Sequence, residues 1–343
     1  CSLPRFLYTG EYPSQEMSPR QIDLLISLGR ECGVPNLLEA DLEHLHLSGA
    51  HTDCILVFTG GEKGGTSSGE RSPVQLSCHK AILCARSPFF RNLVSRRLQA
   101  AVQERAPAPP LRIVLDETVI PQKYARVLVR ALYVDSIDFD LVDDRSAEMG
   151  ERVRDAMELY QIGRFLDLDI LSQNCEDAIV QRLNPANICE VLEWSGQPYG
   201  SAWVHRQAHQ FLLEDFPNIA ASPALERLGK DTMKLLLTSD FLQASEAEVV
   251  AAVVRWGEVC VARRSEGEHC SLPANPGKRG GRRREGVTDR EVAEAVCDLV
   301  ACVRMEQLLP PGGGEVVRQA AERGILTRPW YMTSSRGGGS HSA

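Results

Sequence analysis

The sequence predicts an α+β domain, in which helices surround a small sheet, followed by an all-α domain of helical hairpins. Three observations lead to this prediction. Short strand-like stretches alternate with helices between residues 51 and 134. From Val153 onward, apolar residues recur at helical spacing in segments that short loops connect. With 343 residues, the chain is long enough for two or three domains that each have a core.

Composition narrows the possible functions. The chain is 43% hydrophobic and 24% charged, with a formal net charge of -8. This acidic balance argues against a general binder of nucleic acids or anionic membranes. The longest unbroken apolar run, Val249 to Val254, is far too short to span a bilayer. No signal peptide is visible, and because the chain starts at Cys1 we expect it to be a fragment.

The cysteine pattern indicates the compartment. The chain has 11 cysteines without any CxxC spacing, and it has no Asn-x-Ser/Thr acceptor site. Both facts favour a reducing, intracellular setting, cytoplasmic or nuclear. Several cysteines fall where a small apolar side chain suits a strand or a helix, so we expect them to serve core packing.

The first 47 residues share a pattern with a later part of the chain. A helix is predicted over residues 19–32. Within it, Leu28-Gly29-Arg30 corresponds to Ile162-Gly163-Arg164, and the earlier Leu7-Tyr8 corresponds to Leu132-Tyr133. This correspondence favours an internal repeat, in which the chain begins with the end of a first copy.

Residues 51–90 form the centre of the predicted α+β domain. A short apolar strand, His51 to Phe58, is followed by a Gly/Ser-rich loop that reaches Gln75. A second strand ends at His79 and leads into a short helix. Ser87-Pro88 then provides the N-cap and the first residue of another helix.

The remaining elements follow from the same kind of pattern. After a break at residues 106–110, the alternating residues Leu111 to Leu115 predict a third strand, and residues 119–134 return to a helix. In the later helical region, Ser245 and Glu248 have the spacing of a capping box at the start of a long amphipathic helix.

Two patterns could carry chemistry, and both are incomplete. Gly60 to Thr66 lacks the lysine that a phosphate-binding Walker A loop needs after its last glycine. His205 and His209 are four residues apart on a predicted helix and could reach one metal ion, but Arg206 stands where a zincin has its glutamate. We therefore predict no catalytic, cofactor-binding or metal-binding residues and no enzyme. A zinc-dependent hydrolase, with His205 and His209 as metal ligands, is the least favoured alternative.

Two blocks of sequence resemble a known pair of domains. The pattern H-x-D-C-x-L, followed by C-H-K-A-I-L-x-x-R-S-P-F-F, resembles a BTB/POZ domain. It does so through Asp53, through His79-Lys80 and through the run from Arg86 to Phe90. The run from Leu235 to Trp256 resembles a BACK domain.

A helix end provides a further point of resemblance. BTB domains have Tyr-Thr-Gly there, and Tyr8-Thr9-Gly10 keeps these residues, whereas Tyr133 is followed by Val134-Asp135. The beginning of the chain therefore resembles the tail of another BTB domain, and the whole chain resembles the tandem-BTB members of the family.

The resemblance implies four segments. They are the C-terminal part of a first BTB domain (1–47), a second BTB/POZ domain (48–170), a BACK domain (171–330) and a disordered tail (331–343). Within the BACK domain, residues 263–287 have no periodicity and many Gly, Pro and Arg residues, which predicts a disordered insertion.

The resemblance also implies a non-enzymatic role in protein–protein assembly. We expect a homodimer through the BTB domain and a substrate adaptor for a cullin-3 type ubiquitin ligase, with an unknown protein client. In such adaptors a hydrophobic-x-Glu motif before the third strand binds the cullin, and Val102, Gln103 and Glu104 occupy that place. Asp53 and Lys80 resemble the charged pocket near the dimer seam of the family. The alternative is a BTB scaffold or regulator, nuclear or cytoskeletal, without ligase function.

Overall fold

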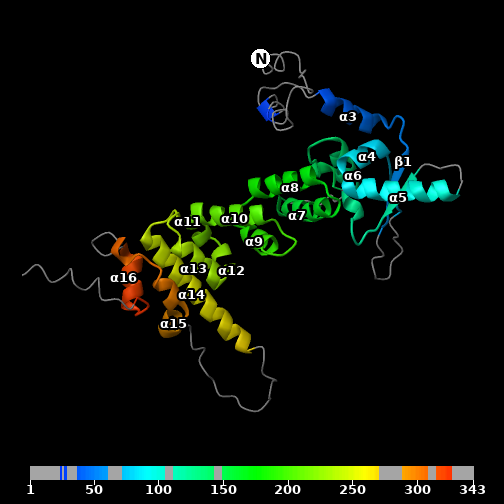
Figure 1. Ribbon diagram of the computed structural model, residues 1–343. Coiled ribbons are helices and arrows are strands. Elements are labelled where there is room, and N and C mark those ends of the chain that lie inside the picture. Colours follow the sequence, from blue (N-terminus) through cyan, green and yellow to red (C-terminus); the bar gives the residue numbers. More distant parts are fainter. Residues whose placement is uncertain are drawn as a thin grey trace, which may run out of the picture. The chain divides into compact units, whose positions relative to one another are not determined.

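The computed structural model of the chain (Figure 1) describes residues 37–60, 72–104, 111–142, 149–269, 288–307 and 314–326, with residues 24, 27 and 28. The chain divides into two compact units, Cys1–Gln181 and Arg182–Ala343. Within the described ranges, no helix is long and apolar enough to cross a membrane. Most of the helix predicted over residues 19–32, the centre of the Gly/Ser-rich loop and the predicted tail 331–343 lie outside these ranges.

The first unit contains a three-stranded sheet with β1 at its centre. Its strands are β1 (Cys54–Phe58), β2 (Val74–Cys78) and β3 (Leu111–Leu115), in the order β2-β1-β3. Strand β1 runs antiparallel to β2 and parallel to β3. A parallel neighbour requires a long crossover, which the helices between β2 and β3 provide. All three strands lie where the sequence predicted strands.

Helices surround this sheet, so the α+β prediction is confirmed. They are α3 (Leu37–Ser48), α4 (Lys80–Arg86), α5 (Pro88–Glu104), α6 (Ala125–Tyr133), α7 (Met149–Phe165) and α8 (Asp169–Gln181), with short 3-10 helices at Gln122–Tyr124 and Phe139–Leu141. Helix α5 begins at Pro88 as predicted, and the Phe90 amide donates a 3.2 Å hydrogen bond to the Ser87 hydroxyl. The helix predicted over residues 119–134 is instead a turn, a 3-10 helix and α6. Pro121 lies at this break, and it has no amide hydrogen to donate to a continuous helix.

Helices α7 and α8 pack side by side at the end of the first unit (Figure 1, green). Gly163 permits their close approach, because a Cβ atom at this position would lie 2.7 Å from the Ser172 Oγ atom. The domain boundary predicted at residue 170 falls inside α8, whereas the structure keeps all of α8 with the first unit. The reason is that α8 buries its apolar face against α7.

Helix α3 belongs with the sheet that follows it. The Glu43 carboxylate lies 2.9 Å from the Arg130 guanidinium of α6, and the His46 ring centre lies 4.9 Å from the ring centre of Tyr133. Residues 1–47 are predicted to be the end of a preceding copy. The contacts attach α3 to α6 of the domain that follows, and the assignment of residues 1–47 to a preceding copy stays a prediction.

The second unit is helical, as predicted. Its elements are α9 (Ile188–Ser195), α10 (Ala202–Glu214), α11 (Phe216–Ala221), α12 (Ala224–Arg227), α13 (Lys230–Thr238), α14 (Glu246–His269), α15 (Asp289–Val300), a 3-10 helix (Met305–Gln307) and α16 (Gly314–Glu322). The predicted capping box starts α14: the Glu248 amide donates to Ser245 Oγ at 3.3 Å, and the Ser245 amide donates to Glu248 Oε2 at 2.8 Å. Trp256 of α14 is buried, and its Nε1 donates to the Leu228 carbonyl at 2.9 Å.

The first residues of the insertion predicted over residues 263–287 are helical in the structure, because helix α14 continues to His269. The remainder, residues 270–287, lies outside the described ranges. Helix α15 follows it with a second capping box, formed by Thr288 and Glu291.

Candidate protein-interaction site

Asp53 and Lys80 meet where the sheet joins α4. The Asp53 carboxylate accepts a 2.8 Å hydrogen bond from the Lys80 amide, and its other oxygen lies 3.8 Å from the Lys80 ammonium group. His79 is the N-cap residue of α4 but makes no capping bond with its own side chain. Asp53 therefore caps a helix that lies far from it in the sequence. The structure brings the two predicted residues together, half-exposed, and gives Asp53 a structural role as well as a charge.

Replacing Asp53 with Ala is expected to destabilise the first unit by about 1 kcal/mol, the usual cost of losing an N-cap. Urea unfolding followed by far-UV circular dichroism measures this change. Asp138 provides the matched control, because its carboxylate caps only a short 3-10 helix without fully buried residues. Equal losses for Asp53→Ala and Asp138→Ala would contradict the capping role of Asp53.

His79 makes two hydrogen bonds to Tyr133 and one to Ala50 behind this cap. The His79 amide donates to the Tyr133 hydroxyl at 2.9 Å, His79 Nδ1 lies 2.7 Å from the same hydroxyl, and His79 Nε2 lies 2.7 Å from the Ala50 carbonyl. Because a carbonyl only accepts, Nε2 carries the ring proton, and Nδ1 accepts from Tyr133. Burial raises the pKa of Tyr133 to about 12, so its hydroxyl stays protonated at neutral pH. The network joins the end of α6 to the start of α4.

Helix α3 lies against this network with the side that carries Glu43 and His46. Leu38, Leu42 and Leu45 follow the i, i+4, i+7 spacing of one helical stripe. Leu38 is 65% exposed, and none of the α3 residues whose side chains are described is buried. The helix thus presents an apolar stripe that the described part of its own chain leaves partly uncovered.

The attachment of α3 is expected to weaken in acid. Burial, together with the nearby Arg130 charge, lowers the pKa of His46 below its ordinary value near 6.5. Because the folded pKa is the lower one, the unfolded chain binds the proton more readily, and stability is lost as the pH falls below about 6.5. Hydrogen exchange of the α3 amides at pH 7.5 and pH 5.5, corrected for the intrinsic rate, measures this loss. In His46→Gln, the corrected exchange of the α3 amides should differ less between pH 7.5 and pH 5.5. An unchanged difference would mean that another group causes the loss of stability in acid.

Val102, Gln103 and Glu104 form the last residues of α5, directly before the segment that leads to β3. Their side chains, and residues 105–110, lie outside what the structure describes. The predicted cullin-binding motif therefore stands at a helix end, and its assignment remains a prediction.

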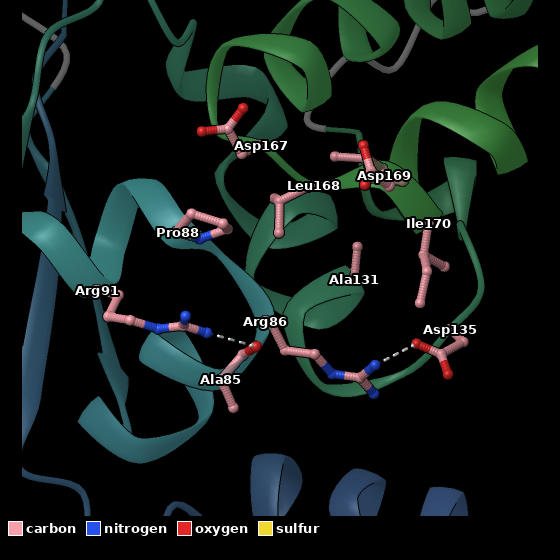
Figure 2. A pocket seen from close by; sticks show the side chains of 11 residues that line it. Ala85, Arg86, Pro88, Arg91, Ala131, Asp135, Asp167, Leu168, Asp169 and Ile170 are labelled. Carbon is pink, nitrogen blue, oxygen red and sulfur yellow. Dashed lines mark hydrogen bonds and ion pairs between the residues drawn. The ribbon is translucent and has the colours of Figure 1, made fainter. Parts of the chain in front are cut away.

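A pocket of about 640 Å³ lies between the α4–α5 junction and the turn that connects α7 to α8 (Figure 2). One side carries Arg86 and Arg91, and the opposite side carries Asp167 and Asp169. Arg86 lies 2.9 Å from Asp135 of the segment that follows α6. Apolar residues line the rest of the pocket: Pro88, Ala131, Leu168, Ile170 and Leu171.

The walls of this pocket are linked by hydrogen bonds. The Ser87 hydroxyl, fully buried, donates to the Leu166 carbonyl at 2.5 Å and so ties the start of α5 to the end of α7. The Asn174 side chain donates to the Asp135 carbonyl at 3.1 Å and ties α8 to the end of α6. These links make the pocket a preformed feature of the fold.

His205 and His209 lie side by side on α10, with ring centres 4.7 Å apart. His205 Nδ1 is 2.9 Å from the Ser195 hydroxyl, while burial and the neighbouring His205 lower the pKa of His209. In the described parts of the chain, no three His, Cys, Asp or Glu side chains are grouped to hold a metal ion. Among the described residues, the pair therefore has no third ligand of the kind that a catalytic zinc site uses.

Comparison with known families identifies both units. The family model of the BTB/POZ domain matches residues 42–183, and the model described as "BTB And C-terminal Kelch" (BACK) matches residues 190–269. This chain belongs to the BTB–BACK family. The predicted family and fold class are thereby confirmed.

Individual relatives agree with this assignment. BTB/POZ domain-containing protein 7 from Homo sapiens is 34% identical over 96% of this BTB–BACK chain, which spans 31% of the relative's length. Kelch-like protein 6 from Homo sapiens is 24% identical over 66% of the chain, which covers 31% of that relative. Kelch-like ECH-associated protein 1B from Danio rerio is 26% identical over 53% of the chain, which covers 28% of that relative.

Sequence reasoning missed the pocket and its ion pair. Asp135 stands where BTB domains have glycine, and this departure was the available signal. Its partner Arg86 could not be inferred, because the two residues are brought together only when α4 packs against the end of α6.

Proposed function

We propose that this BTB–BACK chain is a non-enzymatic adaptor. It pairs with a second copy of itself through the BTB domain and links a protein client to a cullin-3 type ubiquitin ligase inside the cell. Two facts support this proposal: the order of the two domains, and the similarity to Kelch-like proteins, whose family includes such adaptors.

The observation that carries self-pairing is the leucine stripe of α3. An apolar stripe on a helix contributes to stability when a partner removes it from water, at about 25 cal/mol per Å² before the cost of association. Helix α3 is held to α6 by an ion pair and a ring contact on one side. Its partly uncovered stripe is therefore available to the same stripe of a second copy, as a twofold-symmetric interface requires.

Light scattering coupled to gel filtration tests self-pairing. The wild-type chain is expected to run as a dimer, and Leu38→Glu combined with Leu42→Glu as a monomer. Leu47→Glu is the matched control. Leu47 is 78% exposed on the same helix but lies on the side opposite to Leu38. A monomeric wild-type chain, or a dimer that survives the double substitution, would overturn this part of the proposal.

A pulldown with the purified N-terminal domain of cullin-3 tests the ligase link. Glu104→Lys and Val102→Ala are expected to weaken capture, whereas Gln103→Ala, at the unspecified position between them, serves as the control. Capture that is unchanged in both variants would remove the motif assignment. If the wild-type chain is not captured but still dimerises, the alternative of a BTB scaffold without ligase function is favoured.

A further inference from the structure

The pocket of Figure 2 has a side with arginines and a side with aspartates. The two sides differ in whether their charged groups already bind other groups of the domain. On one side, Arg91 donates to the Cys84 and Ala85 carbonyls at 2.8 and 3.5 Å. Arg86 pairs with Asp135 and also donates to the Tyr133 carbonyl at 3.4 Å. Both guanidinium groups are thus held by groups of the domain itself.

The carboxylates on the other side are not used in this way. Asp167 and Asp169 are exposed, and among the described residues no hydrogen bond or ion pair to either side chain is found. Asp167 has a left-handed backbone (φ 52°) that ends α7, where the Leu168 amide donates to the Gly163 carbonyl at 2.8 Å. Asp135 Oδ1 is buried and has no directed hydrogen bond beyond its ion pair with Arg86. Asp167 and Asp169, unlike Asp135, therefore have no cationic partner among the described residues.

An apolar side chain with exposed surface lines the same pocket: Ile170 is 42% exposed. Phe165 lies outside this lining, at the end of α7 and two residues before Asp167 in the chain, and is 51% exposed. The Phe165 ring packs 5.3 Å from that of Phe89, which fixes its position next to the start of α5. An exposed apolar side chain in a charged cavity is typical of a surface that holds a protein segment.

We propose that this pocket docks a protein segment that carries a basic side chain next to an apolar one. Arginine fits best, because its planar group donates to two carboxylates at once, with Asp167 and Asp169 as the acceptors. The apolar neighbour then packs on Ile170. This inference rests on the proposed function only in that the chain acts by binding proteins, and it names the chemistry of one partner.

Methyl nuclear magnetic resonance of the full chain, labelled at isoleucine, tests the proposal with Ile170 as the reporter. The probe is N-acetyl-Phe-Arg-amide, and N-acetyl-Phe-citrulline-amide is its neutral isostere. The arginine probe is expected to shift the Ile170 methyl signal, with an affinity about fivefold above that of the citrulline probe. Neither dimerisation nor cullin binding enters this readout, so its failure is distinguishable from failure of the proposed function.

Variants of the carboxylates complete the test. Asp167→Asn combined with Asp169→Asn should abolish the preference for arginine, and asparagine tolerates the left-handed backbone at 167. Asp177→Asn, exposed on the same helix α8, is the matched control and should keep the preference. Equal affinity for both probes, an unchanged preference in the double variant, or shifts that spare Ile170 would each overturn the proposal.

Discussion

Gly200→Ala is expected to destabilise the BACK domain by about 3 kcal/mol, at the upper end of the usual cost of overpacking. A Cβ atom at this position would lie 2.3 Å from the Trp194 carbonyl oxygen and 2.7 Å from Ser195 Cα. Both are backbone atoms, so no side chain can turn aside to make room. The loop also holds the start of α10, where the Val204 amide donates to the Ser201 hydroxyl at 3.1 Å. Relief of the clash must therefore displace α9 or α10.

Tryptophan fluorescence during urea unfolding measures this effect in one unit. All 4 tryptophans of the chain (Trp194, Trp203, Trp256 and Trp330) lie in the second unit, so the signal reports on that unit alone. Gly229→Ser is the control. Nothing lies within 4 Å of a Cβ atom there, and serine is a good N-cap for α13. A loss for Gly200→Ala no larger than that of the control would show that the α9–α10 loop adapts.

Local signals in the sequence were sufficient for most of the fold. Ser87-Pro88 marked the start of α5, and Ser245 with Glu248 marked the start of α14, because caps act within one turn of a helix. The first strand was predicted from a short apolar run, and the third from alternating apolar residues. The parallel pairing of β1 with β3 was not predicted, since register between distant strands is set by packing that no short window of sequence contains.

The candidate site was predicted less well, for the same physical reason. Asp53 and Lys80 were identified through their resemblance to a family pocket, yet the capping bond between them joins residues far apart in the chain. The role of Tyr133 and the pairing of Arg86 with Asp135 likewise depend on how α6 packs against α4. Gly200 carried no signal at all, because a close backbone approach leaves no pattern in the neighbouring residues.

Tyr133→Phe is expected to destabilise the BTB domain by about 2 kcal/mol, because two polar groups of His79 lose their partner. The Tyr133 hydroxyl accepts from the His79 amide and donates to its ring, while the rest of the side chain is buried. Phenylalanine keeps the ring and its packing against His46, so the loss isolates the hydroxyl.

Hydrogen exchange locates the effect of Tyr133→Phe, since no tryptophan lies in the first unit. Amides of α4 and β2 that exchange through global unfolding should exchange about thirtyfold faster, which corresponds to 2 kcal/mol. Tyr199→Phe is the control, because Tyr199 is 57% exposed and belongs to the second unit. Exchange in α4 that is equally slow in both variants would mean that water replaces the hydroxyl.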